Sequence, residues 1–404
     1  MHITFLLTQS LESPGGGGRY FPLAKALLAQ GYQVTVFALH HNYRELRQRR
    51  FVRDGVTVEY VGQMHVRKEG NHKAYFHPAS LIWITATATL RLSWAAARQP
   101  GDVIHVGKSQ PMNGVAAWIA HKVRHVPIYV DSDDYEAINN RFSARWQQRL
   151  VAWFEDWLPS FAAGITAGNT FIGDRFQSLG YPRNRIVVVH NGADRQIFTA
   201  IDRLESVARL TEMQRQLALV EGQPVVVYVG SMSLVSHAID LLLEAFVSVC
   251  QRQPDAILLL VGSGEDIEGL RTLAEQLGIA SQVRFLGRVP AEEVPFYYRL
   301  GTVTVDPLWD SVQAQSSLSL KLIESIAAGV PCVTTDIGDR RMVVGDAGIA
   351  VPPGDVGALA DGLISVLQDS EKAYCMRQAA LALRDRYWWD VRVHSFASLY
   401  PHAG

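Results

Sequence analysis

A run of glycines followed by an arginine stands where a chain could bind an anion. Residues 15–18 are all glycine, and with Arg19 they follow the first apolar, β-branched segment and precede a segment with helical periodicity. Glycines let backbone amides approach a phosphate closely, and a helix N-terminus adds about half a unit of positive charge. The run matches neither G-x-G-x-x-G nor the Walker pattern, so a flexible turn without a ligand is the alternative.

A second candidate anion site lies late in the chain, where a serine-rich turn precedes a predicted helix. The helix is predicted over 318–328, because Gly329 and Pro331 are typical of a helix end. Free amides in its first turn would face a diphosphate. The serines that could cap it are Ser316, Ser317 and Ser319.

Glu324 lies two turns into that predicted helix, in a segment otherwise too apolar to face water. A carboxylate in such surroundings needs a partner. Two vicinal ribose hydroxyls would satisfy both oxygens, as an acidic residue does in dinucleotide sites. The alternative is an internal hydrogen bond, or an ion pair with Lys321 one turn earlier.

Two further loops follow predicted strands, and ligands bind beyond the carboxyl ends of strands in open parallel sheets. The Gly262-Ser-Gly264 segment superficially resembles a dinucleotide fingerprint, which is weak evidence alone. The acidic segment Val130-Asp-Ser-Asp-Asp-Tyr135 contains Asp133. Asp133 could bind substrate hydroxyls, cap the following helix or be solvated, and its position favours a role in a site.

The elements that must position these residues are short apolar segments alternating with helical patterns, which is typical of βαβ units around parallel sheets. Near-continuous apolar runs such as Ile186-Val-Val-Val indicate sheets covered on both faces. A chain of 404 residues favours two domains of roughly 150–200 residues. Strands are predicted over 2–8, 33–39, 56–61, 103–107, 127–133, 164–168, 186–190, 224–230, 256–262, 283–287, 303–307 and 332–336, and helices in the first half over 19–29, 111–123 and 143–161.

Composition excludes several classes of protein. The formal net charge of −1 argues against nucleic-acid binding. Cys250, Cys332 and Cys375 have the spacing of neither a disulfide framework nor a zinc site. The first predicted strand follows Met1 with no basic leader. We therefore expect a reducing, cytoplasmic location.

Two segments bear on membrane contact. Residues 80–97 are apolar but interrupted by polar side chains, and they fall short of the roughly 20 apolar residues of a membrane span. The second segment has aromatic residues at helical spacing beside arginines, and these either pack in the core, which we favour, or contact a membrane surface. Its residues are Trp146, Leu150, Trp153, Trp157, Arg141, Arg145 and Arg149.

In their order and spacing, several segments make the chain resemble glycosyltransferase family 4, a retaining group with the GT-B fold, over nearly its whole length. The segments are residues 14–18, 189–194, 285–289, 317–331 and 345–349. The resemblance implies an α/β protein with two Rossmann-like, doubly wound parallel-sheet domains facing across a cleft. Residues 1–200 would bind the acceptor, with a helix over 386–404 packing back on them, and residues 215–385 would bind the donor.

The resemblance also implies the reaction and its contacts. A sugar would pass from a nucleotide diphosphate sugar, such as a UDP- or GDP-sugar, to an acceptor hydroxyl with retention and without a metal or other cofactor. Glu324 would hold the ribose, Arg288 and Val289 would flank the base, and the glycine run would approach the diphosphate. The donor-binding set is Gly16, Gly17, Arg19, Ser231, Gly262, Arg288, Val289, Ser316, Ser317, Leu318, Leu320 and Glu324.

The sequence departs from the family pattern in three respects, at four positions. The first of the family's paired glutamates falls at Ser316, its usual diphosphate-binding Arg and Lys fall at Ser231 and His237, and a histidine after the fifth strand is replaced by Asp133. A protonated His237, Lys321 or Arg19 would have to supply the missing positive charge. The predicted catalytic residues are Asp133, His237 and Lys321.

The expected partners are a nucleotide sugar and a sugar, lipid-linked or small-molecule acceptor, in polysaccharide or glycoconjugate synthesis. On the second interpretation of the tryptophan segment, the protein would also contact the inner membrane face peripherally. Two rival functions share the fold: a degenerate homologue that binds nucleotide without turnover, and a nucleotide-sugar 2-epimerase.

Overall fold

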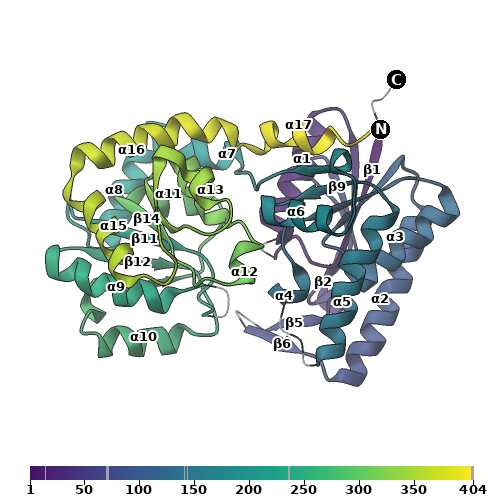
Figure 1. Ribbon diagram of the computed structural model, residues 1–404, viewed down its shortest axis with the longest axis horizontal. Coiled ribbons are helices and arrows are strands. Elements are labelled where there is room, and N and C mark those ends of the chain that lie inside the picture. The colour runs from purple at the N-terminus through teal and green to yellow at the C-terminus, as the bar shows by residue number, and fades with distance from the viewer. Residues whose placement is uncertain (14, 70–71, 141, 143, 235–236, 402–404) are drawn as a thin grey trace. The chain divides into compact units, whose positions relative to one another are not determined.

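The computed structural model describes residues 1–13, 15–69, 72–140, 142, 144–234 and 237–401. The chain forms two compact units, the first made of Met1–Asn191 with Trp389–Gly404 and the second of Gly192–Trp388. Each unit contains a sheet with helices packed against it (Figure 1). Pro14, the first residue of the glycine motif, lies outside the described residues.

The described part of the first unit contains an eight-stranded sheet. Neighbouring strands are parallel, as the fold class predicts, except that β3, a strand the sequence patterns missed, is antiparallel to β4 at the edge of the sheet. β3 carries arginines that protect an exposed edge from pairing with other chains. In spatial order the strands are β10 (Ile186–Val188), β9 (Ala162–Ala167), β8 (Ile128–Ser132), β7 (Val103–Gly107), β1 (His2–Leu7), β2 (Gln33–His40), β4 (Val56–Gln63) and β3 (Arg50–Arg53).

Helices and a small hairpin complete this unit. β5 (Val66–Glu69) and β6 (His72–Tyr75) pair antiparallel, and the sequence patterns missed both. The helices are α1 (Phe21–Ala29), α2 (Pro78–Arg98), α3 (Pro111–Arg124), α4 (Glu136–Asn139), α5 (Arg145–Trp157), α6 (Thr170–Ser178) and α17 (Trp389–Ala397). Among the described residues no helix, α2 included, is long and apolar enough to cross a membrane.

The second unit is built around the sheet order β13-β12-β11-β14-β15-β16, parallel throughout its described pairs. Its strands are β11 (Val225–Val229), β12 (Ile257–Val261), β13 (Val283–Gly287), β14 (Val303–Asp306), β15 (Cys332–Thr335) and β16 (Gly348–Val351). Its helices are α7 (Arg195–Phe198), α8 (Ser206–Gln216), α9 (Ile239–Arg252), α10 (Ile267–Gln276), α11 (Val294–Leu300), α12 (Val312–Gln315), α13 (Leu320–Ala328), α14 (Arg340–Val344), α15 (Val356–Gln368) and α16 (Ser370–Leu383).

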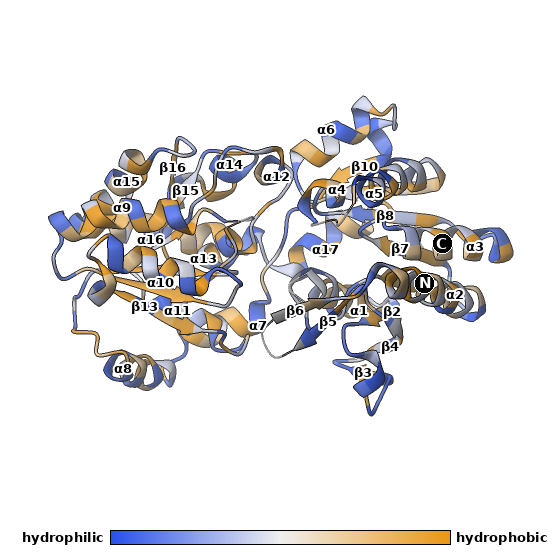
Figure 2. Ribbon diagram, turned by 90° about the horizontal axis from the view of Figure 1, so that it is seen from below, coloured by the Kyte–Doolittle hydropathy of each residue, from blue (hydrophilic) through white to orange (hydrophobic). Residues whose placement is uncertain are grey.

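Both sheets have two buried faces, as the continuous apolar strands predict. In β11, Val226 and Tyr228 pack into one core while Val225, Val227 and Val229 pack into the other. In β1, Leu6 faces the core formed with α2 and α3, whereas Ile3, Phe5 and Leu7 face the core formed with α1 and α17. The colouring by hydropathy shows these apolar strands between the helices of each unit (Figure 2).

A buried histidine lies where the last segment of the chain packs into the first unit. Tyr400, just after α17, has its hydroxyl 2.7 Å from Nδ1 of His105, and the His105 ring stacks against Phe396. Burial is the main reason that the pKa of His105 is lowered to about 3. His105 is therefore neutral in the folded protein at any pH near neutral.

Acid should destabilise the protein through His105. The unfolded chain binds a proton near the ordinary pKa of 6.5 and the folded chain does not, so this contribution is complete above pH 6.5 and is lost as the pH falls toward 3. The expected loss is about 1.4 kcal/mol per pH unit. Urea denaturation at pH 7 and pH 5 should show a smaller pH difference for His105→Phe than for the wild type; an equal difference would contradict the assignment.

Candidate functional site

The glycine run of the first unit is the start of a helix that packs closely against the loop before it. Gly16–Tyr20 form a π-helical turn, η1, that continues directly into α1. A Cβ on Gly16 would lie 2.0 Å from the Ser10 carbonyl oxygen, and one on Gly17 would lie 2.7 Å from that of Leu11. The glycines are therefore needed for internal packing whether or not a ligand binds.

The amides of this turn are already engaged in hydrogen bonds. The Gly17 amide donates to the Ser13 carbonyl oxygen at 2.8 Å, and the Gly16 amide donates to the Ser13 hydroxyl at 3.3 Å. The sequence predicts that both glycines approach a diphosphate. That contact stays a prediction, and amide hydrogen bonds to a phosphate would require the Ser13 bonds to break.

The packing of the glycine turn predicts a stability effect. Gly16→Ala places a methyl group against a backbone carbonyl, so it should lower the free energy of unfolding by about 1–3 kcal/mol or more. The matched control is Gly269→Ala in α10, where a Cβ would meet no atom within 4 Å. That change should stabilise the helix by about 0.5–1 kcal/mol. Equal unfolding midpoints in urea for the two variants would contradict the packing account.

Arg19 does not supply an open positive charge, which corrects the prediction from the sequence. Its guanidinium is buried and donates to both carboxylate oxygens of Asp131, at 2.7 and 2.8 Å, and to Asn191 Oδ1 at 2.9 Å. Burial acts to raise the pKa of Asp131, but the charge and hydrogen bonds of Arg19 outweigh it and keep that pKa below its usual value. The pair joins the helix start to β8.

Lys108 forms ion pairs with the acidic residues that follow β8. Its Nζ lies 2.7 Å from Asp134, 2.8 Å from Glu136 and 3.3 Å from Asp133, and its backbone has a φ of +57°. Strained backbone of this kind is found where surrounding contacts impose it. The sequence patterns missed Lys108, although it directly follows β7 at the ligand-binding edge of a parallel sheet.

Asp133 is buried in this cluster, so the solvated interpretation is wrong. The capping interpretation is wrong as well, since the carboxylate of Glu155 accepts the Glu136 and Ala137 amides at the start of α4. Burial raises the pKa of Asp133 to about 7, against the opposing effect of Lys108. Asp133 can therefore exchange a proton near neutral pH, as a group that binds a reacting hydroxyl would.

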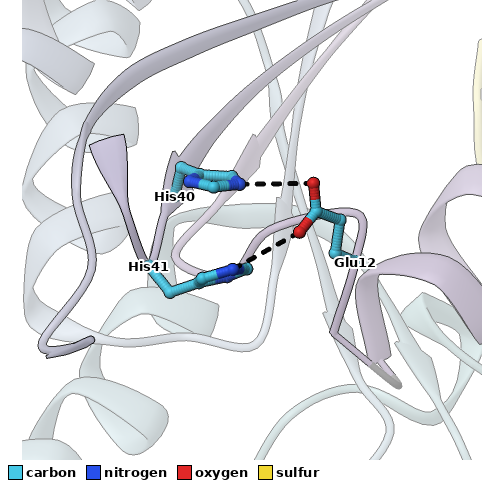
Figure 3. Close-up of side chains that lie close together, drawn as sticks. All are labelled: Glu12, His40 and His41. Atoms are coloured by element: carbon cyan, nitrogen blue, oxygen red, sulfur yellow. Dashed lines mark hydrogen bonds and ion pairs between the residues drawn. The ribbon is translucent and has the colours of Figure 1, made fainter. Parts of the chain in front are cut away.

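A second polar group at this end of the sheet, Glu12 with His40 and His41, was not found from the sequence. Glu12 pairs with Nε2 of both histidines, at 3.4 Å to His40 and 3.3 Å to His41 (Figure 3). The Asn42 amide donates to His40 Nδ1 at 3.0 Å, so in the neutral ring Nε2 carries the proton. A metal bound at Nε2 would need that proton on Nδ1, so the ring does not fit a metal site.

In the second unit, the serine-rich turn leads into α13, which begins two residues later than predicted. Ser319 is the N-cap, and its hydroxyl accepts the Lys321 amide at 3.3 Å. Ser316 is buried and donates to the Gln313 carbonyl oxygen at 3.1 Å. Leu318 is buried, whereas Ser317 and Leu320 are partly exposed. Thus Ser319 alone, of the three serines proposed, caps α13.

Three buried charged groups lie beside the start of α13. Lys321 Nζ is 3.2 Å from Asp306 at the end of β14, and Arg340 Nε is 3.3 Å from the other oxygen of Asp306. Burial acts to raise the pKa of Asp306, but both cations together lower it. Two cations share one carboxylate, so the group keeps a net positive charge next to a helix N-terminus, which favours an anion there.

His237 is next to this group but carries no charge. Lys321 Nζ lies 3.3 Å from His237 Nδ1. Burial, followed by Lys321, lowers the pKa of His237 to about 3. The prediction that a protonated His237 compensates for the missing family cation is therefore wrong; Lys321 and Arg340 provide the positive charge instead.

The two glycine-containing loops of this unit pack backbone to backbone. A Cβ on Gly262, whose φ is +140°, would lie 1.8 Å from the Gly230 carbonyl oxygen, and one on Gly264 would lie 2.1 Å from that of Met232. This packing accounts for the fingerprint-like spacing without a dinucleotide. Ser231, between these contacts, is exposed.

Glu324 is held by a tyrosine. The hydroxyl of Tyr298 in α11 donates to Glu324 Oε2 at 2.9 Å, and within the described residues Oε1 has no hydrogen-bonding partner. Burial raises the pKa of Glu324 to about 7. The internal partner is thus Tyr298 rather than Lys321, and one oxygen is left for a ligand. Arg288 is exposed after β13, and Val289 packs against the core below it.

Comparisons with known proteins match the two units of the chain separately. The family described as "Glycosyl transferase 4-like domain" matches residues 15–192, and "Glycosyl transferases group 1" matches residues 223–369. The chain belongs to the group 1 glycosyltransferases.

Two curated relatives are D-inositol 3-phosphate glycosyltransferases. The protein of Corynebacterium urealyticum is 32% identical over 54% of this chain and 51% of its own length. The protein of Geodermatophilus obscurus is 28% identical over 98% of this chain and 88% of its own length. The chain thus spans about half the length of the first of these relatives.

The solved structures support the GT-B fold. Anabaena Alr3699/HepE in complex with UDP superposes with a TM-score of 0.70 at 20% identity, covering 98% of this chain and 99% of that one. WaaG, a glycosyltransferase involved in lipopolysaccharide biosynthesis, gives 0.72 at 16% identity, covering both chains fully.

In this group 1 glycosyltransferase, the predicted site residues fall into two sets. His237 and Lys321 are in direct contact, and Glu324 follows one turn along α13; Ser231 and Gly262 lie in the packed loops. Gly16, Gly17, Arg19 and Asp133 belong to the first unit. Functional groups that the sequence patterns missed are Asp306, Arg340, Tyr298, Asp131 and Lys108.

Proposed function

We propose that the protein transfers a sugar, with retention of configuration, from a nucleotide diphosphate sugar to an acceptor hydroxyl. The observation that carries the proposal is the positively charged group at the start of α13, one turn before a carboxylate with one open oxygen. The second unit, which matches group 1 glycosyltransferases, contains both.

In this proposal the start of α13 binds the diphosphate. Negative charge grows on the diphosphate as its bond to the sugar breaks, and donors fixed in advance stabilise that charge without reorganising. Lys321 and the first amides of α13 supply such donors. His237 and Asp306 act as positioning residues, because both contact the Lys321 ammonium. No metal or other cofactor is part of the proposal.

Glu324 binds the ribose in this proposal. Its open oxygen accepts one hydroxyl, while Tyr298 holds the other oxygen in place. Arg288 and Val289 lie beside the base, and Ser231, Gly262, Ser317, Leu318 and Leu320 line the donor. Ser316, which is buried and donates to the Gln313 carbonyl oxygen, positions this turn. The acceptor hydroxyl meets the first unit, where Asp133 titrates near neutral pH.

The names of relatives narrow the substrates. The inositol phosphate enzymes and a GDP-mannose-dependent mannosyltransferase of Mycobacterium tuberculosis, 28% identical over 56% of this chain, favour a hexosyl donor and glycoconjugate synthesis. UDP is present in the HepE complexes. We therefore propose a UDP- or GDP-hexose as donor and a sugar, lipid-linked or small polar alcohol as acceptor.

A thermal-shift panel of UDP, GDP and ADP with their hexose conjugates tests donor binding. A ligand at 100 times its Kd should stabilise the folded state by about 2.7 kcal/mol. We expect one nucleoside diphosphate and its sugar to raise the melting temperature more than the others. Equal, negligible shifts with all of them would reject the proposal.

A further inference from the structure

The helices on one face of the first sheet leave large apolar side chains exposed to solvent. In α2 these include Trp83, Leu90 and Trp94, and in α5 they are Trp146, Leu150 and Trp153; we call these six residues the tryptophan face. Their exposed fractions range from 40% to 69%. Soluble proteins rarely expose several large aromatic side chains on neighbouring elements without a binding role.

The spacing of these residues follows from how the helices pack. Trp83, Leu90 and Trp94 are separated by seven and four residues, so they form a stripe opposite the buried Ala88, Leu92 and Ala95 that pack on the sheet. Trp146, Leu150 and Trp153 form the same kind of stripe along α5. Core packing, which we favour for α5 from the sequence, is thus wrong for these three residues.

Neighbouring aromatic rings extend the α5 stripe. Trp153 stacks on Trp157 with ring centroids 5.1 Å apart, and Trp157 contacts Trp118 of α3 at 6.4 Å and Phe161 at 5.0 Å. Figure 1 shows α2, α3 and α5 as neighbours on the same side of the unit. The exposed Trp153 is therefore backed by further aromatic side chains.

The charges of these three helices are almost all positive. α2, α3 and α5 contain Arg91, Arg98, Lys122, Arg124, Arg145 and Arg149, whereas Glu155 and Asp156 are their acidic residues. Glu155 is buried under α4, and Asp156 pairs with Arg175. Lys122, Arg145 and Arg149 are exposed and form no ion pair within the described residues. Arg141 lies outside those residues.

We infer that the tryptophan face binds the surface of a bilayer that contains anionic lipids. Indole rings prefer the level of the lipid headgroups, and neighbouring Lys and Arg side chains are attracted to anionic headgroups. Of the two acidic side chains in these helices as described, Glu155 is buried and Asp156, which is partly exposed, is neutralised by its ion pair with Arg175. The face contacts the bilayer surface without spanning it, and the inference does not depend on the proposed sugar transfer.

Flotation with lipid vesicles tests this inference. The full-length protein is mixed with vesicles of phosphatidylcholine alone, or with roughly one-third phosphatidylglycerol. We expect at least tenfold stronger partitioning onto the anionic vesicles, and a marked loss at high salt, because salt screens the attraction to headgroups. Equal partitioning onto both vesicles, or none onto either, would overturn the inference.

Variants test whether vesicle binding depends on the tryptophan face or on another part of the surface. Trp146→Ser with Trp153→Ser, and separately Arg145→Gln with Arg149→Gln, should each reduce binding to anionic vesicles at least fivefold while the circular dichroism spectrum stays the same. Trp309→Ser, at an exposed tryptophan of the second unit, should leave binding unchanged. Sedimentation showing a dimer that the tryptophan variants dissociate, without vesicle binding by the wild type, would assign the face to a second copy instead.

Discussion

Replacing Arg19 by methionine should lower the free energy of unfolding by about 3–5 kcal/mol, because it leaves Asp131 as an unpaired charge in a buried site. The pair is bidentate, with N–O distances of 2.7 and 2.8 Å, and Asp131 also accepts the Thr166 hydroxyl at 2.5 Å. The loss should appear in urea denaturation at pH 7, with the first unit affected directly.

The matched control is Arg67→Met in β5, whose ion pair with Glu45 at 3.5 Å is largely exposed. Exposed pairs contribute about 0–1 kcal/mol, so this variant should unfold almost like the wild type. The double variant Arg19→Met with Asp131→Leu removes both charges and should recover part of the loss. A small effect of Arg19→Met alone would mean that the pair does not hold the helix start to β8.

Glu324→Gln should weaken binding of the donor about 10- to 100-fold while the fold is retained. A hydrogen bond to a charged group contributes about 1.5–3 kcal/mol, which corresponds to that range. Calorimetric titration with the nucleotide sugar that gives the largest thermal shift measures it. Unchanged affinity would show that Glu324 does not bind the ribose.

The pH dependence of the same titration gives a second test. If the donor requires the carboxylate and the pKa of Glu324 is about 7, affinity should fall as the pH decreases below 7 and level off above it. Glu324→Gln should lack this dependence. Tyr298→Phe should weaken binding less and move the transition to higher pH, because the Tyr298 hydroxyl lowers the pKa of Glu324.

Most strands could be predicted from the sequence because their residues are largely apolar and often β-branched. β7 and β13 have the predicted limits, and β1 differs at one end. The strands that were missed are all four residues long: β3 is rich in arginine, β5 and β6 are mostly polar, and β16 is a short apolar segment. β3 pairs with the next strand along the chain, as β5 does with β6, but such short and polar segments give no clear apolar alternation.

The roles of the candidate site residues could also be predicted only in part from the sequence. Glu324 was noticed because a carboxylate is improbable in an apolar helix, but its partner Tyr298 is 26 positions away in the chain. From the sequence, Arg19 and His237 were expected to offer positive charge to a ligand. In the structure, the buried Arg19 forms an ion pair with Asp131, and burial keeps His237 neutral. Charge state depends on tertiary surroundings, so residue type and spacing identify the candidates without fixing their roles.

The most direct test of the account is proton NMR of the purified protein incubated with the nucleotide sugar that it binds, with and without a simple alcohol acceptor. We predict release of the nucleoside diphosphate together with a glycoside or free sugar that first appears in the donor's anomeric configuration. Binding without any release would indicate a degenerate homologue, and release of a 2-epimer would indicate an epimerase. Either result would contradict the proposal that this chain transfers sugars.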